Sequence, residues 1–278
     1  MSENNKRPYV ISGELDLSDP NIIDMNALDG WREDLDNTLR GMGKNTLWVP
    51  SDEIRRGMLG RLNNAGLPVV SLDDRYVKGE NDFYYIGVSR GADNEYVARV
   101  GYPPIEEQLA RIANLGEVVI ADDVVFSGDM MEWLAGELKK WGTTIAGVIC
   151  GIAIGEGAEK LEAAGIGVDP VLIFDEVDDE LCERDLVVVP GSGRRMPGGN
   201  VLYFDPDKGN PTKWASIPAL YVRKFGAEAY RLSAELLKPG VRLGDEGIGS
   251  FIGLPAQGLA GPALLERASV IETGGNNA

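Results

Sequence analysis

The chain has 278 residues, 44% of them hydrophobic, which is enough for one large α/β domain with additions or for two modest domains. Its 27 basic and 44 acidic residues give a formal net charge of −17, and a field of this sign repels nucleic acids and anionic lipid surfaces. The sequence contains no histidine, which excludes His-dependent serine and cysteine hydrolases and metal centres with histidine ligands.

The first quarter of the chain alternates polar segments with short apolar ones. Residues 1–24 are polar and predict an irregular lead-in. Residues 25–41 carry apolar side chains at spacings of three and four, which indicates an amphipathic helix. A short buried strand is predicted over Thr46–Pro50, a helix over 53–65 and a second strand over Leu67–Leu72.

The next segment predicts a hairpin and a helix. Residues 83–100 are rich in aromatic and β-branched side chains on both sides of a turn at Gly91–Asn94. A helix follows over Ile105–Leu115, in which Glu107 and Arg111 have the spacing of an i,i+4 ion pair.

The centre of the chain has the clearest pattern. Apolar strands are predicted over Glu117–Ala121, Thr144–Ile154 and Val171–Phe174, with helices over Asp129–Trp141 and 156–164 between them. Continuous apolar strands that alternate with helices predict an α/β fold, a parallel sheet flanked by helices on both faces.

These patterns divide the chain into three parts. Residues 1–44 form an N-terminal lead-in and helix, and residues 45–175 form the α/β core. After about residue 176 the alternation loosens, so residues 176–278 are expected to be a helical and irregular C-terminal extension packed on the core.

The most informative segment begins at the strand Val118–Ala121. Two acids, Asp122 and Asp123, follow it at the carboxyl end, where open α/β sheets bind ligands. A turn that contains Gly128 then leads into a helix, whose first N–H groups lack partners and form a seat for an anion. Carboxylates accept hydrogen bonds from paired hydroxyls, such as those of a ribose. The anion seat and the two acids together therefore suit a ribose 5-phosphate, with the phosphate at the helix start and the hydroxyls at the acids.

This segment resembles the phosphoribosyl-pyrophosphate (PRPP) signature of the type I phosphoribosyltransferases. The resemblance implies that Asp122 and Asp123 hold the ribose hydroxyls and act in catalysis. It assigns the 5-phosphate to five consecutive residues: Phe126, Ser127, Gly128, Asp129 and Met130. The family usually has Thr, Ser or Ala where this chain has Phe126 and a small residue where it has Met130, and Asp129 adds a negative charge.

The same resemblance implies further contacts with the substrate. The loop after the first core strand, which receives the pyrophosphate in the family, corresponds to residues 51–57, with Ser51, Arg55 and Arg56 as the candidate residues. The hairpin predicted over 83–100 corresponds to a mobile flap, whose Arg90 would reach the phosphates on closure.

The implied reaction is transfer of ribose 5-phosphate from PRPP to a nitrogen acceptor, with release of pyrophosphate. Mg²⁺ would be carried mainly by PRPP and not by a protein cage, and the sequence offers no dedicated metal-ligand cluster. The acceptor stays open, because residues 176–278 match no acceptor-selecting pattern. Partners would be small molecules, without nucleic acid or membrane, and the resemblance is compatible with a homodimer.

Three alternatives stay open. Asp129 and Glu132 can be a helix N-cap arrangement, with the two acids in a solvated turn. A non-catalytic sensor of PRPP or a nucleotide would keep the same fold. A Mg²⁺-dependent phosphohydrolase would use Asp122 and Asp123 as metal ligands.

The cysteine content and the first residues of the chain bear on the cellular compartment of the protein. Two cysteines, Cys150 and Cys182, form neither a disulfide framework nor a metal cluster. The first residues lack the apolar core of a signal peptide. Both features favour a cytoplasmic protein with reduced thiols.

Overall fold

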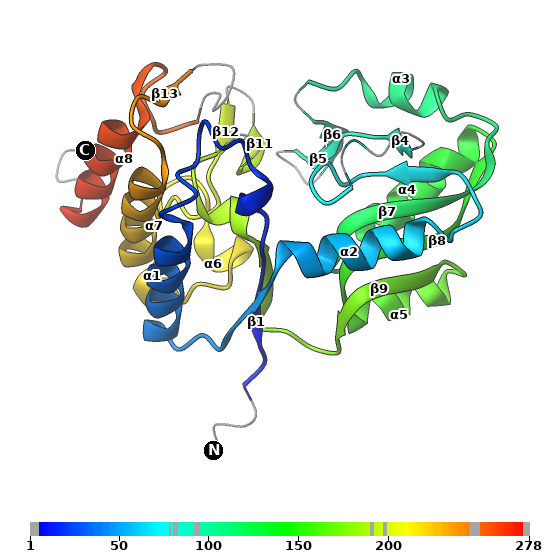
Figure 1. Ribbon diagram of the computed structural model, residues 1–278, viewed down its shortest axis with the longest axis horizontal. Helices are drawn as coiled ribbons and strands as arrows, with labels where there is room; N and C mark the ends of the chain where they lie inside the picture. Colours follow the sequence, from blue (N-terminus) through cyan, green and yellow to red (C-terminus); the bar gives the residue numbers. More distant parts are fainter. Residues whose placement is uncertain are drawn as a thin grey trace. The chain divides into compact units, whose positions relative to one another are not determined.

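The computed structural model (Figure 1) describes most of the chain. The described residues are 6–77, 79, 83–91, 95–99, 101–189, 192–196, 199–244 and 251–274. They form two compact units. The central unit comprises Pro50–Arg90 and Asn94–Val177, and the terminal unit comprises Met1–Val49, Gly91–Asp93 and Asp178–Ala278. None of the described helices combines the length and the apolar character that a membrane crossing requires.

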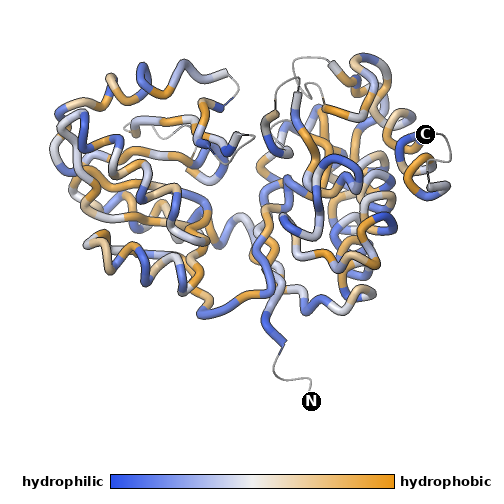
Figure 2. Tube along the Cα trace, turned by 180° about the vertical axis from the view of Figure 1, so that it is seen from behind, coloured by the Kyte–Doolittle hydropathy of each residue, from blue (hydrophilic) through white to orange (hydrophobic). Residues whose placement is uncertain are grey.

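A five-stranded parallel sheet in the order β4-β3-β7-β8-β9 forms the middle of the central unit. Its strands are β3 (Val69–Ser71), β4 (Phe83–Tyr85), β7 (Gly116–Val125), β8 (Thr143–Ile154) and β9 (Gly167–Phe174). Figure 2 shows hydrophobic residues running along these strands. The predicted parallel sheet flanked by helices is therefore confirmed.

Helices cover both faces of this sheet. Neighbouring residues of a strand point to opposite faces, so consecutive residues of β8 contact different helices. Cys150 of β8 belongs to the apolar cluster shared with α4 (Asp129–Lys140) and α5 (Gly155–Ala163). Gly151 lies against Ile54 of α2 (Ser51–Leu62), which crosses the other face (Figure 1). The absence of a side chain at Gly151 allows this close packing.

Three sequence predictions in this unit are corrected. Phe83–Tyr85 does not belong to the hairpin but pairs in parallel with β3, so the antiparallel hairpin is limited to β5 (Val88–Arg90) and β6 (Tyr96–Ala98). Most of its predicted turn, residues 92–94, lies outside the described residues. Helix α3 ends at Ala110. Strand β7 continues to Val125 because it stays paired with β8, so the two acids lie within a strand and not in a turn.

The terminal unit contains a second parallel sheet in the order β10-β1-β2. Its central strand is β1 (Tyr9–Ser12), flanked by β2 (Thr46–Val49) and β10 (Asp179–Cys182). Residues 9–12 are fully buried, which corrects the predicted irregular lead-in. The strand prediction for Thr46–Pro50 is right, but the strand belongs to this sheet and not to the central one.

Helices from both ends of the chain complete this unit. The predicted helix α1 (Leu28–Gly41) buries Leu28, Trp31, Leu35 and Leu39 in the same apolar cluster as α7 (Val222–Leu236) and α8 (Ala260–Glu272). The segments separated above as lead-in and extension therefore share one hydrophobic core. The part of this unit that the structure describes also contains the strands β11 (Arg194–Met196), β12 (Gly199–Val201), β13 (Arg242–Leu243) and β14 (Gly258–Leu259), the helix α6 (Pro211–Trp214) and short 3₁₀ turns at Leu15–Leu17, Glu183–Leu186 and Ala219–Tyr221.

Candidate functional site

The central sheet has a topological switch point between β3 and β7. After β3 the chain first adds β4 on one side and later β7 on the other. In open parallel sheets, ligands bind outside the carboxyl ends of the strands at such a point. Asp122 and Asp123 lie in the carboxyl-terminal half of β7, and Asp73 is the second residue after β3. The charges of the three groups act on one another, so they form one acidic cluster.

Like Asp73, Asp122 is buried, with 3% of its surface exposed. Its Oδ1 accepts a hydrogen bond of 3.1 Å from the backbone N–H of Asp123, while Oδ2 is buried without a hydrogen-bond partner among the described residues. Burial raises the pKa of Asp122 well above its usual value, and the neighbouring charges of Asp123 and Asp73 raise it further. A buried acceptor of this kind is costly unless a ligand satisfies it.

Asp73 is a member of the cluster that the sequence analysis missed. Its carboxylate accepts backbone N–H groups of Arg75 and Val77, both at 2.8 Å, and so shapes the loop after β3. Burial and the charge of Asp123 raise the pKa of Asp73 to about 6. The available signal was an acid directly after the strand predicted over Leu67–Leu72, the same arrangement that marked the acids of β7.

The loop between β7 and α4 is shaped by the left-handed backbone conformation of Gly128 and by hydrogen bonds of Ser127. Gly128 has φ +75° and is the N-cap of α4, and the Oγ of Ser127 accepts a hydrogen bond of 3.4 Å from the N–H of Asp129, the first residue of this helix. The Oγ of Ser127 donates to Asp129 Oδ2 at 2.9 Å. Because Asp129 is the first residue of the helix and not its cap, the capping alternative is wrong. One N–H group at the start of α4 is thus bound to the side chain of Ser127.

The two apolar residues of this loop have different environments. The ring of Phe126 is 40% exposed, whereas Met130 packs partly buried against the core cluster of the central unit. Met130 therefore serves packing, and Phe126 presents an apolar surface next to the start of α4.

Helix α5 approaches this loop closely at a glycine. A Cβ on Gly157 would overlap the carbonyl oxygen of Phe126, and a Cβ on Gly128 would lie 3.2 Å from the carbonyl oxygen of Gly157. The two backbones touch here because both positions lack side chains. Gly157 therefore fixes the position of the loop.

Lys160 of α5 counteracts the acids at the start of α4. Its Nζ lies 2.5 Å from Asp129 Oδ1 and 2.7 Å from Glu132 Oε2. The hydrogen bonds from Lys160 and Ser127 lower the pKa of Asp129, and those to Asp129 and Glu132 raise the pKa of Lys160. Two negative charges beside the anion seat are thereby reduced to a net charge of −1. Sequence reasoning did not find Lys160, because only the packing of α5 beside α4 brings it there.

The hairpin β5–β6 packs against α4 through an aromatic contact. The ring of Tyr96 stacks on Trp133 with a centroid distance of 4.6 Å. Arg90 is exposed, and its charge contributes to the lowered pKa of Asp129 after the hydrogen bonds from Lys160 and Ser127. A role of Arg90 in phosphate binding stays a prediction.

The loop assignment for residues 51–57 rested on a wrong premise. The strand before it belongs to the terminal unit, and the first strand of the central sheet is β3, followed by residues 72–77. Ser51 is buried in the first turn of α2, and Arg56 pairs on the surface with Asp52 at 2.9 Å. Arg55 reaches the loop after β3, where its Nη1 donates to the carbonyl of Tyr76 at 2.7 Å.

Comparison with known proteins gives structural likenesses only. No protein-family model and no curated protein sequence matches the chain. Among solved structures it is similar to adenine phosphoribosyltransferase from Rhodothermus marinus, with 15% identity and a TM-score of 0.33 over 44% of this chain and 77% of that one. Orotate phosphoribosyltransferase from Aeropyrum pernix gives 16% identity and a TM-score of 0.29, over 43% and 68% of the respective chains.

UMP synthase from Leishmania donovani gives 15% identity and a TM-score of 0.31, and the match covers 44% of this chain but 26% of the synthase. The first two structures are phosphoribosyltransferases, the kind of protein that the segment around Asp122 resembles. At this level of similarity, neither a family nor a reaction follows for this chain.

Proposed function

We propose that the central unit binds PRPP at the switch point and transfers its ribose 5-phosphate to a nitrogen acceptor. The observation that supports this most directly is the acidic cluster of Asp73, Asp122 and Asp123 in the unit where Gly128 begins α4. Acceptor-only carboxylates suit the ribose hydroxyls, and the free N–H groups of a helix start suit the 5-phosphate.

In the proposed reaction, the bond from C1 of the ribose to the pyrophosphate oxygen breaks and a bond from C1 to the acceptor nitrogen forms. The leaving pyrophosphate takes the bonding electrons, and the acceptor nitrogen loses its proton to a base, for which a carboxylate of the cluster is available. The ribose becomes cationic on the way, so no covalent nucleophile is needed. Asp122 and Asp123 hold the hydroxyls, and the turn at Ser127 and Gly128 fixes the phosphate.

The acidic cluster is also compatible with Mg²⁺ delivered on the diphosphate of PRPP. The buried Oδ2 of Asp122 lacks a partner among the described residues, and a divalent cation would offset the repulsion within the cluster. When bound, Mg²⁺ would supply charge neutralisation for the leaving pyrophosphate.

Calorimetry with PRPP and Mg²⁺ tests the binding step. The wild-type protein should bind, and the double variant Asp122→Asn/Asp123→Asn should lose at least 100-fold in affinity while keeping its fold by circular dichroism. Pyrophosphate release with a panel of purine and pyrimidine bases tests the transfer. Equal binding by wild type and variant would rule the site out.

A non-catalytic sensor is the second candidate, and one observation favours it. The hydroxyl of Ser127, which would contact the phosphate, donates to Asp129 instead, so the loop carries its own anion. A sensor would bind PRPP in the calorimeter but release no pyrophosphate with any base.

Lys160 provides a prediction specific to this chain. In Lys160→Met, the carboxylates of Asp129 and Glu132 lose their counter-charge and repel the phosphate, so the affinity for PRPP is expected to fall about 10-fold. Calorimetry at low salt measures the change. The matched control is Lys139→Met at the opposite end of α4, which should bind as the wild type does. Unchanged affinity in Lys160→Met would contradict a phosphate at this helix start.

A further inference from the structure

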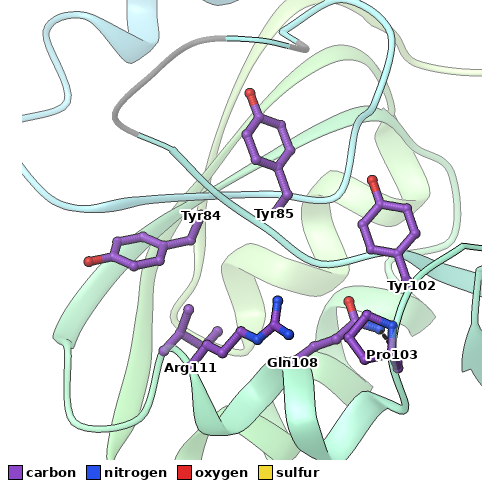
Figure 3. A pocket seen from close by; sticks show the side chains of 7 residues that line it. Tyr84, Tyr85, Tyr102, Pro103, Gln108 and Arg111 are labelled. Carbon is purple, nitrogen blue, oxygen red and sulfur yellow. Dashed lines mark hydrogen bonds between the residues drawn. The ribbon is translucent and has the colours of Figure 1, made fainter.

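A cavity lies in the central unit, lined from one side by the edge strand β4. Its volume is about 330 Å³, and its lining includes Tyr84, Tyr85, Tyr102, Gln108 and Arg111 (Figure 3). The switch point lies between β3 and β7, whereas this cavity is bounded by β4, by the segment before α3 and by α3 itself. Its lining contains none of the three acids of the cluster, although the charge of Asp73 acts on the lining residue Tyr102.

The walls of this cavity are fixed by hydrogen bonds and packing. The side-chain amide of Gln108 accepts from the N–H of Gly87 at 2.7 Å and donates to the carbonyl of Pro103 at 2.7 Å. The ring of Tyr102 lies directly against Gly87, where a Cβ would overlap it. The hydroxyl of Tyr85 donates to a backbone carbonyl at 2.7 Å. A cavity held in this way is preformed, which lowers the cost of binding.

Arg111 is the charged group of the lining. The predicted ion pair with Glu107 is not formed among the described residues, because α3 ends at Ala110 and Arg111 is its C-cap. No carboxylate of the described residues pairs with Arg111, and its side chain is exposed. Figure 3 shows its guanidinium pointing toward the space between the tyrosine rings. An unpaired guanidinium in a cavity is a site for a carboxylate, which it can bind through two parallel hydrogen bonds.

We propose that this cavity binds a small planar aromatic carboxylate of one or two rings. The tyrosine rings offer aromatic faces for stacking, and Arg111 offers the counter-charge. The volume lies at the lower end of the range for small-molecule sites, which fits a ligand of this size. The proposal does not depend on PRPP binding, because it uses none of the residues at the switch point.

Calorimetry with 2-naphthoate, and with the neutral 2-naphthamide as its matched probe, tests the proposal. In Arg111→Gln the affinity for 2-naphthoate should fall at least 10-fold, while 2-naphthamide should bind within twofold of wild type. Tyr84→Ala should weaken both probes about fivefold, since it removes a ring and no charge. Tyr84 and Arg111 are exposed, and thermal melting checks that both variants stay folded.

The control is Arg56→Gln, an exposed arginine on α2 away from the cavity lining, which should bind 2-naphthoate as wild type does. Saturating PRPP with Mg²⁺ should leave 2-naphthoate binding unchanged. Three results would overturn the proposal: no binding of 2-naphthoate to the wild type, equal binding by Arg111→Gln, or displacement by PRPP. Binding of an extended peptide along β4 with no binding of 2-naphthoate would assign the cavity to a protein partner instead.

Discussion

Asp122→Asn is expected to make the central unit more stable than the wild type at pH 7.5 and at the same time to weaken PRPP binding at least 100-fold. Asparagine has the shape of aspartate without its charge, and its Oδ1 can keep the hydrogen bond from the N–H of Asp123. Its Nδ2 replaces an oxygen that is buried without a partner among the described residues, and it can donate to the nearby carboxylates. The gain should be about 1–3 kcal/mol, the usual cost of a buried unsatisfied group.

The pH dependence of this gain identifies its cause. The folded protein raises the pKa of Asp122 above its ordinary value of 3.8. Below that value the carboxyl is protonated in both folded and unfolded chains, so wild type and variant should be equally stable. As the pH rises toward and through the raised pKa, ionisation favours the unfolded wild type, and the advantage of Asp122→Asn should grow.

Native-state hydrogen exchange of the amides in β7 and β8 measures this difference within the central unit. The matched control is Asp169→Asn on the edge strand β9, an exposed acid paired with Arg61, where a change of about 0–1 kcal/mol is expected. A variant Asp122→Asn that is less stable than wild type at every pH would show that the charge serves the fold and not a ligand.

Gly157→Ala should destabilise the central unit and displace the loop that precedes α4. The added methyl group would overlap the carbonyl oxygen of Phe126, a backbone atom that cannot move without the loop. Overpacking of this kind costs about 1–3 kcal/mol. Because the same loop is the proposed phosphate seat, PRPP affinity should fall at least 10-fold. Urea unfolding and calorimetry measure the two effects.

Gly136→Ala is the matched control for this substitution. Gly136 lies inside α4, and nothing lies within 4 Å of the position its Cβ would take. Alanine is the better helix former, so this variant should gain about 0.5–1 kcal/mol and keep its PRPP affinity. If Gly157→Ala behaved like Gly136→Ala, the close contact between α5 and the loop would not exist in solution.

The sequence predicted the features that depend on neighbouring residues. The apolar run before Asp122, the glycine at 128 and the helix after it are local signals, and all three lie where the pattern indicated. Strand β1 was missed because only four apolar or small residues, Tyr9–Ser12, stand in a polar segment, and they form a strand by pairing with β2 and β10.

Contacts between distant segments were beyond the reach of a single sequence. Lys160 reads as an ordinary surface lysine until α5 is placed beside α4, and Gly157 reads as part of a strand-to-helix connection. The position of Asp73 next to Asp123 depends on β3 and β7 being neighbours, which their separation in the chain does not indicate. The strand Thr46–Val49 was placed in the central sheet for the same reason, since nothing local assigns it to the other sheet.

The pairing of β1 with β10 also has a consequence for biosynthesis. β1 lies near the N-terminus, but its partner Asp179–Cys182 emerges only after the whole central sheet has been made. At translation speeds of about 5–20 residues per second, β1 waits roughly 10–30 s for that partner. The residues of the central unit therefore emerge from the ribosome before the sheet of the terminal unit can be completed. During that time the apolar strand β1 lacks its partner β10 and is accessible to a chaperone.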